Sequence, residues 1–365
     1  MKTYKHLYPR ICDFRNLYAG YRDARRGKRD KKQVFDFEFN AESELPCLQD
    51  ELRAQTYQPG AYTSFRLDDR KRRLISAAPF RDRVVHHALC NIIEPIFERK
   101  FIDDSYANRK GKGTHRALDR TQEFARRYRF VLQSDVVQFF PSIDHAILRG
   151  LLARPIADEQ TRWLIDQILA SGAYVHVGQY VMQRFPGDDL FARDRPRGLP
   201  IGNLTSQFWA NVYLNEMDQF VKRELQCAAY VRYVDDFLLF ADDKHVLWKW
   251  KARLAEFLQT LRLVAHPHKT VVYPVADGIP FLGWRIYPTH RRLKRANVRD
   301  FTRRFREQVA AFQRGEMTFD DLTTRTRSWI AHAAHGDTWR LRARLFQTQP
   351  IPRSGLVAVG APAVG

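Results

Sequence analysis

Residues 228–241, AAYVRYVDDFLLFA, constrain the fold more than any other part of the chain. Two strongly apolar segments meet there at the adjacent carboxylates Asp235 and Asp236, and each segment is typical of a buried β-strand. Two neighbouring anions at the end of buried strands repel each other and are costly to remove from water. Such a pair also occurs in ordinary solvated turns. The pair alone therefore does not decide between a cation-binding site and a solvated turn.

A carboxylate far away in the sequence favours a cation-binding site. Asp135 lies in another apolar, β-rich segment, residues 129–137 (RFVLQSDVV). If the two segments are neighbouring strands, Asp135 and Asp235 converge on one site. Carboxylate oxygens are the ligands that Mg²⁺ prefers, and two such ions about 4 Å apart serve phosphoryl transfer. The sequence therefore predicts a metal-binding acidic site.

The pattern along the chain predicts an α+β fold, because helices are interleaved with short β-hairpins rather than alternating with single parallel strands. No GxGxxG or GxxxxGK[ST] motif supports a doubly wound nucleotide-binding sheet. The expected elements are a hairpin over 62–76, a helix over 81–100, a helix after Asp144, a β-like stretch over 173–183, a helix over 204–225, a helix over 243–262, a strand near 270–275, a hairpin over 280–294 and helices over 297–346.

Charge and composition indicate the kind of partner. The 61 Lys and Arg residues outnumber the 41 Asp and Glu residues and give a net charge of +20, which favours a polyanion such as nucleic acid. No apolar run approaches the length of a membrane span, and the first residues do not resemble a signal peptide. Four scattered cysteines fit a reducing cytoplasm, and we expect a cytoplasmic protein; they are Cys12, Cys47, Cys90 and Cys227.

Several segments, in order and in register, resemble the motifs of reverse transcriptases. FVLQSDVVQFFPSID resembles motif A, and RYVDDFLLF resembles motif C with its YxDD box. GLPIGNLTSQFWANVYLNEMD resembles motif B, HPHKT falls where motif D has its lysine, and FLGWRI resembles motif E. RLISAAPFRDRVVHHALCNIIEPIFE and SYANRKGKGTHRAL resemble the preceding fingers segments. The resemblance covers about residues 60–345.

This resemblance implies roles for the acidic cluster. Asp135 and Asp235 would be the ligands of two Mg²⁺ ions, for which Mn²⁺ is an alternative, and Asp236 would be a weaker, outer ligand. The main-chain carbonyl of Val136 would contact one ion. Lys269 would donate a proton to the departing pyrophosphate.

The resemblance also implies a site for the incoming deoxynucleotide. Phe140 matches the aromatic gate that excludes a 2′-hydroxyl by volume. Arg73, with Arg72 and Arg83 as helpers, matches the basic residues that hold the triphosphate. The remaining residues expected at this nucleotide are Val136, Phe139, Ile201, Gly202, Gln207 and Tyr233.

Motif B departs from the usual Gln-Gly followed by Ser-Pro, since Ile201 stands at the Gln position and Gln207 at the Pro position. The pattern IGxxTSQ is similar to that of reverse transcriptases of diversity-generating retroelements, within the group II intron-like bacterial and phage superfamily. These enzymes copy a template RNA with errors at adenines, and the mutated cDNA rewrites a variable gene. An apolar Ile201 cannot hydrogen-bond the nucleotide, which would reduce discrimination against mispairs by about 1–2 kcal/mol.

The resemblance implies a right-hand polymerase. We expect an N-terminal basic extension over 1–60, fingers over 60–130 and 145–200, a palm over 130–145 and 200–290, a helical thumb over 291–346 and a disordered tail over 347–365. Residues 291–306 hold eight Lys or Arg and one acid, so this helix should follow the phosphate backbone of the template–primer. The arginines expected to do so are Arg295, Arg299, Arg303, Arg304 and Arg306.

The implied partners are a template RNA, an RNA/DNA template–primer, deoxynucleoside triphosphates and a small basic accessory protein that forms a helical barrel. Two alternatives stay open. One is a defence-associated or group II intron-like reverse transcriptase, although an intron enzyme would be expected to carry a larger maturase region. The other is a non-catalytic RNA-binding protein on a polymerase scaffold, against which the three aspartates count.

Overall fold

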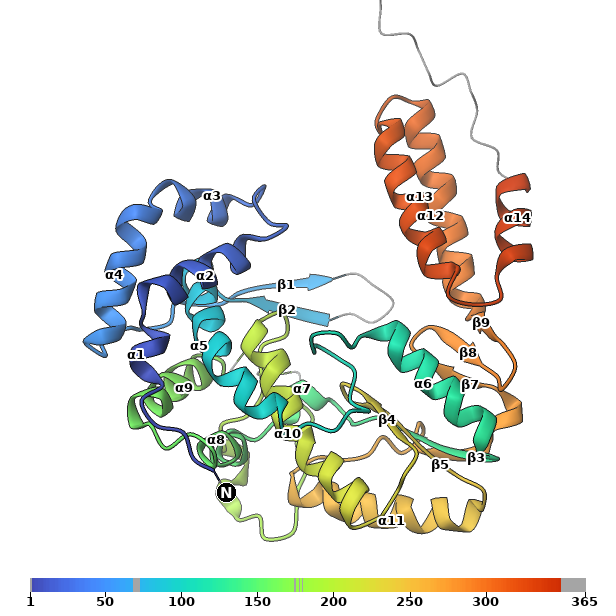
Figure 1. The fold of residues 1–365 in the computed structure, drawn as a ribbon, viewed down its shortest axis with the longest axis horizontal. Coiled ribbons are helices and arrows are strands. Elements are labelled where there is room, and N and C mark those ends of the chain that lie inside the picture. The colour runs from blue at the N-terminus through green and yellow to red at the C-terminus, as the bar shows by residue number, and fades with distance from the viewer. Residues whose placement is uncertain (1, 68–72, 174, 177, 179, 349–365) are drawn as a thin grey trace, which may run out of the picture. The chain divides into compact units, whose positions relative to one another are not determined.

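The computed structural model of the chain describes residues 2–67, 73–173, 175–176, 178 and 180–348 (Figure 1). Helices and short strands are interleaved along the chain, so the predicted α+β class is confirmed. The chain divides into two compact units. The first comprises Met1–Gly113, Leu132–Leu239 and His245–Val272, and the second comprises Thr114–Val131, Phe240–Lys244 and Tyr273–Gly365.

The first unit is built largely from helices. The long helix α5 packs against α2, and Gly20 makes this possible because a Cβ there would lie 2.8 Å from the carbonyl oxygen of Val84. Helix α10 in turn packs against α5 and α8. The helices with most or all of their residues in this unit are α1 (Tyr8–Ile11), α2 (Phe14–Arg25), α3 (Lys32–Phe39), α4 (Ala41–Arg53), α5 (Phe80–Glu98), α7 (Phe139–Ser142), α8 (His145–Ala153), α9 (Glu159–Ser171), the 3₁₀ helix η1 (Leu190–Asp194), α10 (Leu204–Arg223) and α11 (Lys244–Thr260).

Two sheets position the predicted site. A hairpin joins β1 (Thr63–Leu67) to β2 (Arg73–Ala77). A four-stranded sheet has the order β4-β5-β3-β6, so β5 and β3 are neighbours. Strand β4 pairs antiparallel with β5, and Tyr233 lies opposite Asp236. The strands of this sheet are β3 (Phe130–Ser134), β4 (Tyr230–Tyr233), β5 (Asp236–Ala241) and β6 (Val271–Pro274).

The second unit holds a three-stranded antiparallel sheet and a helical bundle. The sheet has the order β7-β8-β9. In the bundle, buried phenylalanines of α12 form a core with Leu322 and Leu345, and the ring of Phe301 stacks on Trp329 with centroids 3.8 Å apart. The elements of this unit are α6 (Thr114–Arg127), the 3₁₀ helix η2 (Val275–Asp277), β7 (Ile279–Phe281), β8 (Trp284–Ile286), β9 (Arg291–Leu293), α12 (Arg295–Gln313), α13 (Phe319–Ala333) and α14 (Trp339–Thr348).

One expectation about local structure is wrong, and another is incomplete. The described residues of 173–183 form turns and extended chain without a strand, because they are held by single contacts such as that from the Val181 amide to Gln138 Oε1 (3.0 Å). The expected hairpin over 280–294 has a third strand, β9, since a turn closed by the Tyr287 amide and the His290 carbonyl returns the chain to β8. The turn at Asp68–Arg70 and the tail beyond residue 348 lie outside the described residues.

Candidate active site

The structure brings Asp135 and Asp235 together. Asp135 directly follows β3, and Asp235 lies in the turn that precedes β5, the neighbouring strand. Burial, and after it the negative charges of Asp135 and Asp236, raise the pKa of Asp235 to about 7. The carboxylate of Asp235 therefore lies within interaction distance of the carboxylate of Asp135.

A cation from a distant part of the sequence joins this pair. The Lys269 ammonium forms an ion pair with the carboxylate of Asp135. The adjoining main chain is fixed because the His266 amide donates to the Asp135 carbonyl at 2.7 Å. Lys269 thus lies at the acidic site, at the position where the sequence placed a proton donor.

The donor set fits a hard divalent cation. Two carboxylates converge, and Asp236, the first residue of β5, adds a third anion next in sequence. Val136, whose carbonyl was expected at a metal, is buried and forms an isolated antiparallel bridge with Ala265. Within the described part of the chain, no group of three or more His, Cys, Asp or Glu side chains has metal-binding geometry. The fit therefore rests on the oxygens of Asp135 and Asp235.

The two phenylalanines of motif A lie on the short helix α7, directly after Gln138, which has a left-handed backbone (φ +44°). Phe139 is buried, whereas Phe140 is partly exposed, and their ring centroids are 5.4 Å apart. The carbonyl of Phe140 accepts a hydrogen bond from the Leu199 amide at 2.9 Å. This bond ties the predicted gate to the loop that carries Ile201.

The motif B loop is bound to strand β2. The Ile201 carbonyl accepts from the Ser76 amide at 3.0 Å, and the Asn203 side chain donates to the Ser76 carbonyl at 3.2 Å. Gly202 has φ +117°, a backbone conformation that favours glycine, and a Cβ there would also lie close to Ile75 Cγ2, at 3.1 Å. Because β2 begins at Arg73, the structure places the backbone of that residue on the strand that adjoins the loop.

The other predicted nucleotide contacts lie on three different elements. Tyr233 ends β4, and Gln207 lies in the first turn of α10. Arg83 on α5 donates from Nε to the Ala78 carbonyl at 2.9 Å, and burial lowers the pKa of its guanidinium. Arg72 lies outside the described residues.

The predicted nucleic-acid contacts lie on α12 in the second unit. All five arginines are exposed, whereas the phenylalanines Phe301, Phe305 and Phe312 of the same helix are buried. Arg303 pairs with Glu307 at 3.1 Å, a surface contact of little strength. The five are Arg295, Arg299, Arg303, Arg304 and Arg306.

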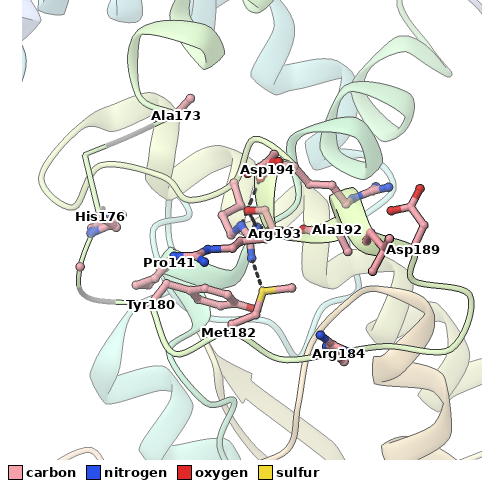
Figure 2. Close-up of a pocket in the computed structure, with 14 residues that line it drawn as sticks. Pro141, Ala173, His176, Tyr180, Met182, Arg184, Asp189, Ala192, Arg193 and Asp194 are labelled. Carbon is pink, nitrogen blue, oxygen red and sulfur yellow. Dashed lines mark hydrogen bonds between the residues drawn. The ribbon is translucent and has the colours of Figure 1, made fainter.

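A separate cavity of about 690 Å³ lies beside α7, against Pro141 (Figure 2). Several arginines line the cavity. One of them, Arg197, makes its contacts within its own loop: it donates to Met182 Sδ at 3.1 Å and to the Ala192 carbonyl at 3.0 Å. Its guanidinium also lies over the ring of Tyr180. These contacts hold the segment before the motif B loop.

Sequence reasoning missed one part of the site, a buried ion pair between Arg232 and Asp218. Arg232 immediately precedes Tyr233 of the YxDD box, and Asp218 lies on α10. The only sequence signal is an arginine in an otherwise apolar strand.

The chain matches the family model described as "Reverse transcriptase (RNA-dependent DNA polymerase)" over residues 67–286, a range that contains Asp135, Asp235 and Lys269. Converging carboxylates at the ends of neighbouring strands are an arrangement that metal-dependent nucleotidyltransferases use. The match is to more than half of the chain, and the protein belongs to the reverse transcriptase family.

The chain is similar to curated proteins and to solved structures. Protein YkfC of Escherichia coli (strain K12) is 27% identical in an alignment 283 positions long, and the match covers 67% of this chain and 71% of that protein. The group II intron-encoded protein LtrA of Lactococcus lactis subsp. cremoris is 28% identical over 184 residues, 50% of this chain but only 28% of LtrA. A structure of apo telomerase from Candida tropicalis, truncated from its C-terminal domain, has a TM-score of 0.46 and 12% identity, and covers 67% of this chain and 59% of that one.

No helix in the described ranges combines the length and the apolar character that crossing a membrane requires. None of the four cysteines forms a disulfide.

Proposed function

We propose that this chain is an RNA-directed DNA polymerase, with Asp135 and Asp235 as its catalytic carboxylates. The observation that carries the proposal is the convergence of these two side chains at the ends of neighbouring strands, together with the family match. When bound, two Mg²⁺ ions would activate the attacking 3′-hydroxyl and stabilise the departing oxygen. Asp135 and Asp235 would hold them, with Asp236 and the Val136 carbonyl as further oxygen ligands.

The other residues of the site would bind and orient the nucleotide. Arg73 would hold the triphosphate with Arg72 and Arg83 as helpers, and Phe140 would exclude a 2′-hydroxyl. Lys269, which pairs with Asp135, would donate a proton to the pyrophosphate once that carboxylate has another partner. The arginines of α12 would contact the phosphates of the template–primer.

We further propose that synthesis is error-prone at template adenines and serves the diversification of a target gene. Support comes from Ile201: its carbonyl is bonded to β2, so the residue stands in the loop that adjoins the predicted triphosphate strand. An isoleucine packs there but donates no hydrogen bond, so a mispaired nucleotide loses less than it would against a glutamine. The partners of this role are a structured template RNA and a small basic accessory protein.

Sequencing of cDNA made from a defined RNA template tests the finer proposal. The wild type should misincorporate most often opposite adenine, and Ile201→Gln should reduce those errors by about tenfold. Ile201→Val is the matched control, since it keeps an apolar side chain, and its error spectrum should equal that of the wild type.

If active Ile201→Gln protein makes the same adenine errors as the wild type, the apolar residue is not their source. Accurate synthesis by the wild type would contradict the diversifying role itself, while leaving the polymerase proposal intact.

A second candidate is a group II intron-like or defence-associated reverse transcriptase. The 28% identity to LtrA over 184 residues favours it. This candidate predicts cDNA synthesis without an excess of errors at adenine, so the same sequencing experiment separates the two.

A further inference from the structure

Arg232 is buried completely beside the catalytic turn. Neither its side chain nor that of Asp218 has any exposed surface, and the two form a bidentate pair, with Nε to Oδ1 at 2.7 Å and Nη2 to Oδ2 at 2.6 Å. The remaining nitrogen, Nη1, donates to Asn211 Oδ1 at 3.1 Å and to the main-chain carbonyl of Val234 at 3.0 Å. The guanidinium therefore joins helix α10 to the turn that carries Asp235.

This turn has a conformation that its own residues do not favour. Tyr233 pairs with Asp236, so the hairpin loop consists of Val234 and Asp235 alone. Val234 has φ +56°, in the left-handed region, where two-residue hairpin turns usually place glycine or asparagine. A β-branched residue is strained there, and such strain persists only where the surroundings impose it.

Helix α10 supplies a rigid anchor. Asn211 and Asp218 are seven residues apart, which is about two helical turns, so they lie on one face. Asn211 is itself fixed because it donates to the Ala107 carbonyl at 2.9 Å, and Asp218 also accepts from the Tyr230 hydroxyl at 2.8 Å. The same helix begins directly after the motif B loop, so one element bears on both the nucleotide loop and the catalytic turn.

We propose that Arg232 is a positioning residue that holds the Val234–Asp235 turn in its left-handed form and thereby sets the place of the Asp235 carboxylate. The inference rests on the catalytic role proposed above for Asp235. A planar guanidinium suits this task because its fork binds a carboxylate through two nitrogens and still presents a third to a carbonyl.

The test is Arg232→Lys, which keeps the positive charge beside Asp218 but cannot make all of these bonds at once. The matched control is Arg81→Lys. Arg81 pairs with Glu44 and Glu51 on α4, and none of these residues belongs to the β4–β5 hairpin. We expect Arg232→Lys to lower kcat for nucleotide incorporation about 10- to 100-fold without weakening template–primer binding. Arg81→Lys should change neither.

A second readout does not depend on activity. Hydrogen exchange of the amides in 232–237 should become faster in Arg232→Lys and stay unchanged in Arg81→Lys. Adding Val234→Gly to Arg232→Lys should recover part of the lost kcat, because glycine adopts a left-handed backbone without strain. A purely structural ion pair would give no such rescue.

Two results overturn the inference: an Arg232→Lys protein with the kcat of the Arg81→Lys control, or unchanged exchange in the hairpin. Failure of the proposed function would give a different result, because the wild type itself would then extend no primer on an RNA template. In that case the exchange measurement still decides whether Arg232 holds the turn.

Discussion

Asp235→Asn should stabilise the folded protein, and by an amount that depends on pH. The substitution preserves shape and removes one of two anions that lie together at the ends of buried strands. Burial and the neighbouring Asp135 raise the pKa of Asp235 from an ordinary value of 3.8 to about 7. In the unfolded chain this side chain ionises near pH 4, whereas in the folded protein it keeps its proton until the pH approaches 7.

The sign and the size of this pH dependence follow from the linkage between proton binding and folding. Between these two pKa values the folded state binds more protons than the unfolded state, so wild-type stability falls as the pH rises through this window. The full loss is at most about 4 kcal/mol, because each tenfold change in an ionisation constant is worth about 1.36 kcal/mol. The asparagine amide of the variant cannot ionise, so the advantage of the variant should be small near pH 4 and greatest above pH 7. That difference corresponds to several degrees in melting temperature.

Thermal melting of both proteins at closely spaced pH values measures this advantage. Asp50→Asn is the control, because Asp50 is an exposed carboxylate of α4 and lies outside the strands that carry the acidic pair. Mg²⁺ added at pH 8 should raise the melting temperature of the wild type, which offers both carboxylates, more than that of Asp235→Asn. A melting difference that is the same at every pH would refute the account of the buried pair.

Two further predictions concern substrates. Phe140→Ala should admit ribonucleotides, because the ring volume that would meet a 2′-hydroxyl is removed; the ratio of incorporation efficiencies for a ribonucleotide and its deoxy counterpart measures this, and an unchanged ratio would make Phe140 a packing residue only. Neutralising Arg303, Arg304 and Arg306 should weaken template–primer binding on all sequences alike and reduce its salt slope by roughly one unit per lost phosphate contact, whereas an unaltered salt dependence would place α12 away from the duplex.

Much of the scaffold was predictable because its signals are local. The apolar runs around Asp135 and Asp235 indicate buried strands, and the helical period over 204–225 matches α10. The strand predicted over 173–183 was wrong because alternating apolar residues favour a strand only when a neighbouring strand is present to pair with them. The described residues there contact single side chains and carbonyls instead.

The contacts that complete the site are not local, and the sequence gives no direct sign of them. Lys269 and Asp135 are 134 positions apart and meet only after β3 and the segment before β6 have come together. The pairing of Arg232 with Asp218 depends on the register of β4 against α10, which no pattern within either element specifies. Motif resemblance names residues such as Ile201, but only the structure shows that its loop is bonded to β2.

The most direct test of the central proposal is incorporation of deoxynucleotides into a DNA primer annealed to an RNA template, measured for the wild type, Asp235→Asn and Asp50→Asn at equal bound template–primer. The account predicts that the wild type and Asp50→Asn extend the primer at the same rate. Asp235→Asn should remain folded, bind the template–primer and add no nucleotide. Extension by Asp235→Asn at the wild-type rate would contradict the assignment of the converging carboxylates as the catalytic centre.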